Sequence, residues 1–582
     1  MKEFRTLLPY IKKRIPMYLM GILFLLITNI GQLIIPQILR WVVDSFNHGI
    51  TDGNFLLLAL SSLVGTALII ALSRIGWRFF IIGAARRIET DLRHKIFEHL
   101  LDLSSPFYGQ HKTGDLMARA TNDLDAVRMS VGMALVAFTD GVFITVSVFI
   151  ILFTQNPSLG VFVLLPLPLI TLIILLFGGV VGRRFKKVQE EYSALSGQVQ
   201  ESLTGIRVLK AFVQEKATQE RFNATSEKYK KANMKLVQLW GLFFPIIGLL
   251  SGFTTLILLY TGGSAVMAGE MTPGEFTAYL SYLGMLVWPM LGMGFTVNII
   301  QRGAASLARI NQILDTPPEI SSPAQPLPLP QSFQLELKGL TFQYPDGKED
   351  VLKGLDLTIP QGTFLGILGP TGSGKSTLAR LLPRLLEAPE NTVFIDGESL
   401  RNFELSQLRK CFSMVPQTTF LFSDTIKGNI AFGMPEATDE QLRFVADLST
   451  ISRDFEAFEN GWETLVGERG VSLSGGQKQR VALSRALLTQ APILILDDAL
   501  SAVDVETEEK ILNHFLATRQ GKTTLLISHR VNTLKLCSQI VVLEDGLITQ
   551  RGPHSQLLEE EGTYREIALL QSLQHKSEGG NQ

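Results

Sequence analysis

Six apolar stretches in the first half of the chain restrict its fold more than any other feature. Each is long enough to cross the hydrocarbon layer of a membrane, which takes about 20 helical residues. They lie near residues 17–42, 55–82, 131–153, 158–182, 237–262 and 272–300. We therefore predict an all-α transmembrane domain of six helices.

The connections between these stretches alternate in length and charge. The short ones, 43–54, 154–157 and 263–271, contain no Lys or Arg, whereas the long ones, 83–130 and 183–236, are rich in both. Since Lys and Arg accumulate in cytoplasmic loops, we predict that the long loops, the N-terminus and the C-terminal half face the cytoplasm. Folded as two antiparallel helices, each long loop would extend roughly 35 Å beyond the membrane.

Apolar side chains lie at the expected turn of each long loop. We place one turn at residues 111–123, with Leu116 exposed, and the other at 202–212, with Phe212 exposed. Short helices opened by a glycine would present these side chains to a partner surface. The alternative is a solvated charged hairpin without a partner, which would not need apolar residues at its tip.

The second half of the chain has the composition of a soluble α/β protein. We expect a transmembrane domain over 1–316, a proline-rich linker over 317–331, an α/β domain over 332–572 and a disordered tail over 573–582. The net charge of −1 does not indicate nucleic acid as a partner. Cys411 and Cys537 lack metal-ligand spacing, so we expect buried thiols in a reducing compartment. The N-terminus lacks the apolar core of a secretory signal.

A glycine-rich loop follows a short apolar strand and opens a helix, in the order that a phosphate-binding loop requires. The loop and the start of the helix are Gly369, Pro370, Thr371, Gly372, Ser373, Gly374, Lys375, Ser376 and Thr377. Backbone N–H groups would converge on the phosphates of ATP at the positive end of the helix. Lys375 would offset β/γ-phosphate charge, and the Ser376 hydroxyl would bind Mg²⁺.

Two further apolar strands end in polar residues. Asp497 closes the strand that starts at Ile493 and would complete the Mg²⁺ site with Ser376, directly or through water. His529 follows another strand at the edge where open α/β sheets bind ligands, so we assign it to the γ-phosphate. A structural role, which is more common for a lone His, is the alternative.

The strings LSGGQKQR (473–480) and ILILDDALSAVD (493–504) occur behind this phosphate loop and the six apolar stretches. With them, the chain resembles a half-transporter of the ATP-binding-cassette (ABC) exporter family over its full length. The resemblance implies ATP and Mg²⁺ as cofactors, and a dimer in which each ATP lies between one chain's phosphate loop and the other's LSGGQ. Within LSGGQ, the residues that would contact the partner's ATP are Ser474, Gly475, Gly476 and Gln477.

Further positions match the family's motifs one by one. Tyr344 corresponds to the aromatic residue that stacks on adenine, and Gln417 to the glutamine that contacts Mg²⁺ and the attacking water. Glu468 matches the exporter loop that contacts the hairpin tips. Asp504 matches the aspartate that communicates across the dimer.

Asp498 departs from the family pattern, which has Glu as the catalytic carboxylate. Asp is shorter by one methylene group, about 1.5 Å, and proton transfer from water needs a carboxylate within about 3 Å. Such a displacement could slow hydrolysis on the order of 10²-fold. We therefore expect a slow site here and a heterodimer with a second, competent half-transporter. The alternative is a homodimeric exporter with slow ATPase activity.

The resemblance implies an ATP-driven exporter of amphipathic or hydrophobic compounds, such as drugs or lipids, in the bacterial inner membrane. ATP binding would close the two ATPase domains, and the hairpin tips would transmit that motion to the spans. The alternative from another functional class is an ATP-gated channel or regulatory subunit that uses the same domain as a switch.

Overall fold

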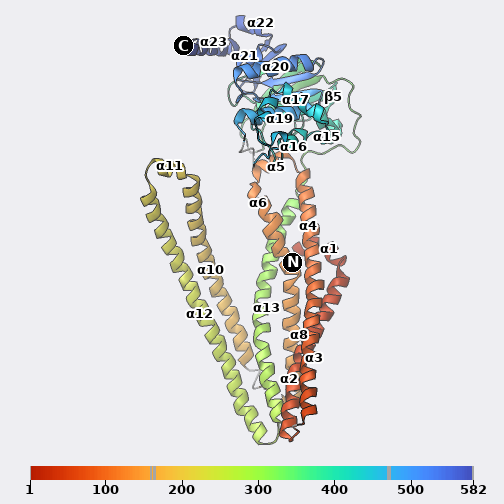
Figure 1. The fold of residues 1–582 in the computed structure, drawn as a ribbon, viewed down its shortest axis with the longest axis vertical. Helices are drawn as coiled ribbons and strands as arrows, with labels where there is room; N and C mark the ends of the chain where they lie inside the picture. Colours follow the sequence, from red (N-terminus) through yellow and green to blue (C-terminus); the bar gives the residue numbers. More distant parts are fainter. Residues whose placement is uncertain are drawn as a thin grey trace. The chain divides into compact units, whose positions relative to one another are not determined.

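The computed structural model describes residues 2–50, 52–157, 160–161, 166–345, 347–467 and 473–579. The chain divides into two compact units (Figure 1). The first unit comprises Met1–Leu101 and Lys112–Thr316, and the second comprises Asp102–His111 and Pro317–Gln582. The first is helical and the second is mixed α/β, so the predicted fold class is confirmed.

Long helices make up the first unit. Its elements are η1 (Lys2–Leu7), α1 (Leu8–Lys12), α2 (Ile15–Asn47), α3 (Gly53–Trp77), the π-helical η2 (Arg78–Ile82), α4 (Gly83–Asp102), α6 (Thr113–Ala118), η3 (Arg119–Asp123), α7 (Leu124–Val131), α8 (Met133–Gln155), α10 (Pro166–Thr204), α11 (Ile206–Ala211), α12 (Glu215–Met267) and α13 (Pro273–Leu314).

Among the described residues, four helical segments are long and apolar enough to cross a membrane. They are Ile15–Asn47, Gly53–Asp102, Thr113–Gln155 and Glu215–Met267. The expected count of six helices is therefore not confirmed. Part of the predicted span 158–182 lies outside the described residues.

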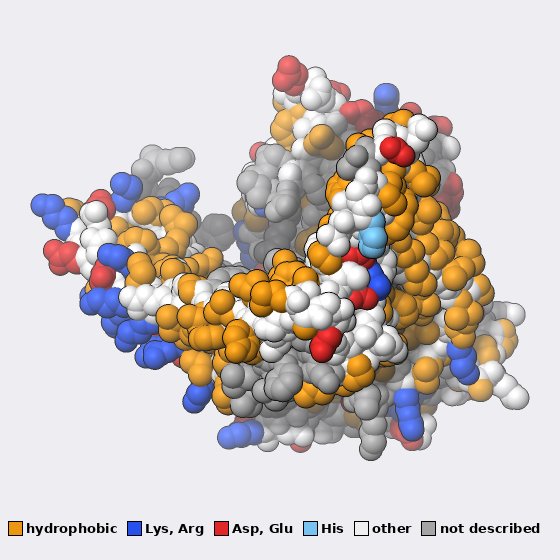
Figure 2. Space-filling view, turned by 90° about the horizontal axis from the view of Figure 1, so that it is seen from below, with side chains coloured by type: hydrophobic (Ala, Val, Ile, Leu, Met, Phe, Trp, Pro, Cys, Tyr) orange, Lys and Arg blue, Asp and Glu red, His pale blue; other side chains and the backbone are white. Residues whose placement is uncertain are grey.

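The outer faces of these helices carry exposed apolar side chains. Leu57, Leu72 and Ile75 of α3 are each exposed by 65% or more. Figure 2 shows hydrophobic side chains over broad areas of the helical surface. A contiguous apolar surface of this kind is unfavourable in water, and it suits helices that contact lipid.

Glycines let α2 approach α3 and η2 closely. A Cβ atom at Gly21 would lie 2.4 Å from Cγ1 of Ile81, and one at Gly31 would lie 2.7 Å from Cγ1 of Ile70. Between membrane helices there is little hydrophobic driving force, so small residues that permit close packing stabilise the contact.

The two long basic loops form helical hairpins, as expected. α10 and α12 lie side by side, α11 forms the turn between them, and Phe212 next to it is 71% exposed (Figure 1). The position of the other turn was predicted wrongly. The chain turns at α5 (Ser105–Gln110), and residues 119–131 already pack along α13. Leu116 is therefore buried, with 5% exposure, instead of forming an exposed tip.

Two sheets form the centre of the second unit. One has the strand order β2-β1-β4-β5 and the other has the order β10-β9-β3-β8-β7-β6. The strands are β1 (Leu335–Phe342), β2 (Leu352–Ile359), β3 (Phe364–Leu368), β4 (Val393–Ile395), β5 (Glu398–Ser399), β6 (Phe412–Val415), β7 (Ile493–Asp497), β8 (Thr523–Ile527), β9 (Gln539–Glu544) and β10 (Leu547–Gly552). β6, β7, β8, β3 and β9 are parallel, so their C-terminal ends meet at one edge.

Helices cover these sheets. They are α14 (Lys375–Leu381), η4 (Leu400–Asn402), α15 (Leu405–Lys410), α16 (Ile426–Ala431), α17 (Asp439–Leu448), α18 (Ser452–Glu456), η5 (Gly461–Glu463), α19 (Gly475–Leu488), α20 (Val505–Thr518), α21 (Val531–Leu534), α22 (His554–Glu559) and α23 (Thr563–Gly579). Every residue of β3, β7 and β8 is buried. Burial on both faces explains their uninterrupted apolar sequences.

The segment 317–331 follows the surface of the second unit. The Leu327 N–H donates to the Asn402 carbonyl at 2.8 Å, and the Leu405 N–H donates to the Ser322 hydroxyl at 3.0 Å. The Ile320 N–H donates to the hydroxyl of Ser104, 3.0 Å away. The turn that contains α5 is thus hydrogen-bonded to the start of this unit.

Candidate active site

The glycine-rich loop connects β3 to α14, and its backbone requires glycine. Gly374 has φ of 97°, in the left-handed region, and a Cβ there would lie 2.6 Å from Cδ2 of Leu352. At Gly369 a Cβ would lie 2.0 Å from the carbonyl oxygen of Leu543. The loop can therefore hold its N–H groups at the start of α14, where they suit an anion.

Lys375 is buried and folded over this loop. Its Nζ donates to the carbonyls of Gly369 (2.7 Å) and Pro370 (2.6 Å). Burial lowers the pKa of Lys375, and the negative charges of Asp497 and Asp498 oppose that shift. These carbonyls hold the ammonium group beside the loop, at the place where phosphate charge would be offset.

Ser376 and Asp497 form the oxygen-rich part of the site. The Ser376 hydroxyl donates to Oδ1 of Asp497 at 3.0 Å, and Asp497 is 1% exposed. Burial raises the pKa of Asp497, while the bond from Ser376 acts in the opposite direction. Oδ2 of Asp497 is buried and has no partner among the described residues. A hydroxyl and an under-coordinated carboxylate are oxygen ligands that fit Mg²⁺.

Tyr344 lies beside the start of α14. Its hydroxyl is 3.1 Å from Oγ1 of Thr377, and its ring makes an edge contact with Phe342, with centroids 5.2 Å apart. The side chain is half-buried. An aromatic ring held at this point is available to stack on a flat base.

Gln417, Asp498 and His529 follow the ends of neighbouring parallel strands, β6, β7 and β8. Gln417 and His529 are exposed, and Asp498 is half-buried. Asp498 has a left-handed φ of 51°, and its N–H donates to the Ile527 carbonyl at 3.0 Å. The fold thus brings the three predicted catalytic residues to one edge of the sheet, and the described contacts include no hydrogen bond between their side chains.

The loop that carries His529 is held from two sides, which the sequence did not predict. Gln571 of α23 donates to the His529 carbonyl at 2.6 Å and accepts from the Val531 N–H at 2.8 Å. Arg530 donates to the carbonyls of Ser501 (3.1 Å) and Val503 (3.2 Å).

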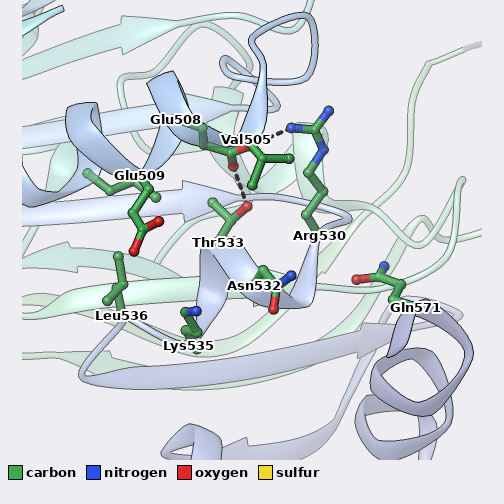
Figure 3. A pocket seen from close by; sticks show the side chains of 10 residues that line it. Val505, Glu508, Glu509, Arg530, Asn532, Thr533, Lys535, Leu536 and Gln571 are labelled. Atoms are coloured by element: carbon green, nitrogen blue, oxygen red, sulfur yellow. Dashed lines mark hydrogen bonds and ion pairs between the residues drawn. The ribbon is translucent and has the colours of Figure 1, made fainter. Parts of the chain in front are cut away.

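Figure 3 shows Arg530 and Gln571 among the residues that line a cavity of about 510 Å³ between α20, α21 and α23. Arg530 also pairs with the buried Glu508 at 2.5 Å, and Glu508 accepts a further bond from Thr533. The ion pair between Arg530 and Glu508 therefore joins the segment after β8 to α20, which follows β7, within the second unit.

The LSGGQ segment begins α19. Ser474 caps the helix by accepting from the Gln477 N–H at 3.3 Å, and the Gln477 side chain accepts from the Ser474 N–H at 3.0 Å. Gln477 also donates to Oδ1 of Asp454 at 2.9 Å. A Cβ at Gly476 would lie 2.8 Å from the Ala502 carbonyl oxygen. Only glycine therefore lets the N-terminal end of α19 approach the segment after β7. Gly475 next to it lies at the same helix start.

Asp504 caps α20 by accepting from the Thr507 N–H at 2.9 Å, and this bond lowers the pKa of Asp504. Glu468, assigned to the exporter loop, lies outside the described residues. Both cysteines are buried, as expected, and burial raises the pKa of Cys537 to about 12.

Together, a helical membrane unit and an α/β unit with a phosphate-binding loop define a membrane-bound ATPase. Comparison with known families makes this specific. Residues 18–290 match the family model of the ABC transporter transmembrane region, and residues 352–501 match the family model named ABC transporter. The chain belongs to the ABC transporter family and has the architecture of its exporters.

Similar proteins cover nearly the whole chain. It is 37% identical to the multidrug resistance-like ATP-binding protein MdlA of Escherichia coli (strain K12), over 99% of this chain and 97% of that protein. It is 36% identical to the probable multidrug resistance ABC transporter ATP-binding/permease protein YheI of Bacillus subtilis (strain 168), over 97% and 96%. An ATP-dependent lipid A-core flippase of Desulfotalea psychrophila is 35% identical over 83% and 84%. The solved structure of a bacterial Atm1-family ABC exporter with ATP bound aligns with a TM-score of 0.79 at 25% identity, over 96% and 98%.

Proposed function

We propose that this exporter chain works as one half of a heterodimer and hydrolyses ATP slowly at its own phosphate loop. The observation that carries the proposal is Asp498, which stands at the C-terminal end of β7 where the family has Glu. Its carboxylate is about 1.5 Å shorter in reach than that of Glu. The left-handed backbone at Asp498 is fixed by its bond to Ile527, so the main chain does not compensate freely.

The other residues of the site are suited to ATP binding. Lys375 would offset phosphate charge, Ser376 and Asp497 would hold Mg²⁺, and Tyr344 would stack on adenine. Bound Mg²⁺ would supply charge neutralisation at the phosphates. Gln417 would orient water and His529 would contact the γ-phosphate from the neighbouring strand ends. We expect this site to bind ATP tightly and only the hydrolytic step to be slow.

In the proposed heterodimer, the LSGGQ segment of this chain would act at the ATP site of the second half-transporter. Ser474, Gly475, Gly476 and Gln477 would complete the site at the partner's phosphate loop, and Asp504 would contact the partner nearby. A helix start with free N–H groups favours phosphate. This chain would therefore support rapid hydrolysis in its partner while its own site turns over slowly.

Drugs or lipids of amphipathic character are the proposed substrates, because the similar proteins are named for multidrug resistance and lipid A-core transport. We place the chain in a bacterial inner membrane with its ATPase domain in the cytoplasm, on the basis of the basic long loops. We also propose the domain limits 1–316, 317–331 and 332–572. The expected disordered tail over 573–582 is not retained, because α23 continues as a helix to Gly579.

The test is to purify the full-length chain alone and together with a candidate second half-transporter carrying Glu at the matching position. Turnover of ATP and uphill drug transport in proteoliposomes should be low for the lone chain and high for the pair. Rapid turnover and transport by the lone chain would show a homodimer instead. ATP turnover without accumulation by the pair would favour the channel or regulatory alternative.

A further inference from the structure

An apolar cavity of about 510 Å³ lies in the membrane unit, beside the N-terminal segment. Its walls come from η1 and α1, from the first turns of α2, and from α7, α8 and α13. The residues that line it are Phe4, Ile11, Ile15, Tyr18, Leu19, Ser130, Val131, Leu135 and Ile300. Apart from Ser130 and the Tyr18 hydroxyl these side chains are hydrocarbon, and both of those groups are already bonded to backbone carbonyls. The cavity is lined mainly by hydrocarbon and suits an alkyl chain.

Two basic residues lie in the chain between two residues that line the cavity, where the apolar stretch of α2 begins. Lys12 and Lys13 are exposed, and neither pairs with a carboxylate among the described residues. Ile11 before them and Ile15 after them both line the cavity. The chain thus carries two exposed ammonium groups between two cavity-lining residues, where a membrane span starts.

Arg14 is the next residue in the chain, and its side chain contacts α4. Its side chain is 10% exposed, and Nη2 pairs with Oδ2 of Asp91 at 2.7 Å. Nε and Nη1 are buried and have no partner among the described residues. Buried donors normally find a partner, so the positive charge at this helix start is only partly satisfied by the chain.

We propose that the cavity binds one acyl chain of an anionic phospholipid, whose phosphate lies at Lys12 and Lys13 next to Arg14. The apolar lining accounts for the chain, and the unpaired cations account for the preference for negative charge. Basic residues beside a span attract anionic lipid by about 1 kcal/mol each, or roughly fivefold in affinity. The site is separate from the ATPase domain and does not depend on the proposed division of catalytic labour.

Native mass spectrometry of the purified full-length chain tests this, with phosphatidylglycerol, phosphatidylcholine and inorganic phosphate as separate probes. One phosphatidylglycerol should bind at least about tenfold more tightly than phosphatidylcholine. The double substitution Lys12→Gln/Lys13→Gln should reduce that preference at least several-fold. Inorganic phosphate alone should not bind measurably, because it lacks the chain that fills the cavity.

Matched variants separate this site from general lipid contact. Lys228→Gln/Lys231→Gln removes two exposed charges from α12 and should leave the preference intact. Leu135→Trp should fill the cavity and weaken binding of both lipids, and Leu19→Trp serves as a second cavity-filling variant if the first unfolds. Equal affinity for the two lipids would overturn the proposal. So would loss of the preference in the α12 variant, unchanged binding in both cavity-filling variants, or displacement of lipid by phosphate alone.

Discussion

Asp497 and Asp498 are neighbours in the chain but occupy different environments. Asp497 is 1% exposed and accepts a hydrogen bond from Ser376 at 3.0 Å. Asp498 is half-buried, and its backbone turns into the left-handed region with φ of 51°. The first carboxylate is fixed beside the phosphate loop, and the second emerges at the sheet edge. The two acidic residues can therefore differ in chemical role although one peptide bond separates them.

Asp497→Asn should stabilise the nucleotide-free protein at neutral pH. Burial raises the pKa of Asp497 in the folded state, so the folded protein favours the protonated form and loses stability as pH rises through that pKa. A neutral amide is cheaper to bury than a carboxylate. We expect a gain of roughly 1–3 kcal/mol at pH 7, the usual cost of a buried unsatisfied polar group. Thermal unfolding without nucleotide or Mg²⁺ measures it.

The stabilisation by Asp497→Asn should disappear below about pH 4, where Asp is protonated even in the unfolded chain. The same variant should lose the additional stability that Mg²⁺ with ATP confers. Asp545→Asn is the control, because Asp545 is exposed in the turn between β9 and β10. Destabilisation at pH 7, or equal effects in the two variants, would contradict the assignment of Asp497 as a buried carboxylate that holds Mg²⁺.

Gln571→Met should weaken ATP binding without weakening ADP binding. The amide of Gln571 bonds to the His529 carbonyl and to the Val531 N–H, and His529 is assigned to the γ-phosphate that ADP lacks. Loss of about 1 kcal/mol of hydrogen bonding corresponds to roughly a fivefold change in affinity. Displacement of a bound fluorescent nucleotide by ATP and by ADP measures the ratio of the two affinities.

Ser572→Ala is the matched control for Gln571, because the Ser572 hydroxyl donates to the Leu569 carbonyl within its own helix. In a His529→Ala background, Gln571→Met should have no further effect on the ATP to ADP ratio. An undiminished effect in that background would show that α23 acts on something other than His529.

Phe212→Ser should leave thermal stability within about 0.5 kcal/mol, because the side chain is 71% exposed. If the tip at α11 contacts a second subunit, drug-stimulated ATPase activity of the assembled transporter should fall several-fold. Leu203→Ser, at a residue 66% exposed on α10, should not change it. Equal activity in both variants would favour the solvated hairpin.

The sequence predicted the parts of the fold that rest on local pattern. Apolar runs located four helical segments long enough to cross a membrane, and the order of strand, glycine loop and helix located the phosphate loop. Burial of β7 brought Asp497 to Ser376 as expected, because parallel strands share one edge.

Packing between distant segments could not be predicted in the same way. Leu116 was expected at a turn, but it is buried, and this depends on how residues 119–131 pack on α13. The contacts of Gln571 with the His529 loop join residues 42 positions apart through one amide. Neither the burial of Leu116 nor the contacts of Gln571 produce a periodic pattern of apolar residues in the sequence.

The most direct test of the account is steady-state ATP turnover by the purified full-length chain with Asp498→Glu, compared with the unchanged chain. Both proteins should bind ATP with similar affinity, since Lys375, Ser376 and Asp497 are untouched. Restoring the longer carboxylate should raise turnover on the order of 10²-fold. Brisk turnover by the unchanged chain, with no increase on Asp498→Glu, would contradict the claim that this subunit carries a slow site.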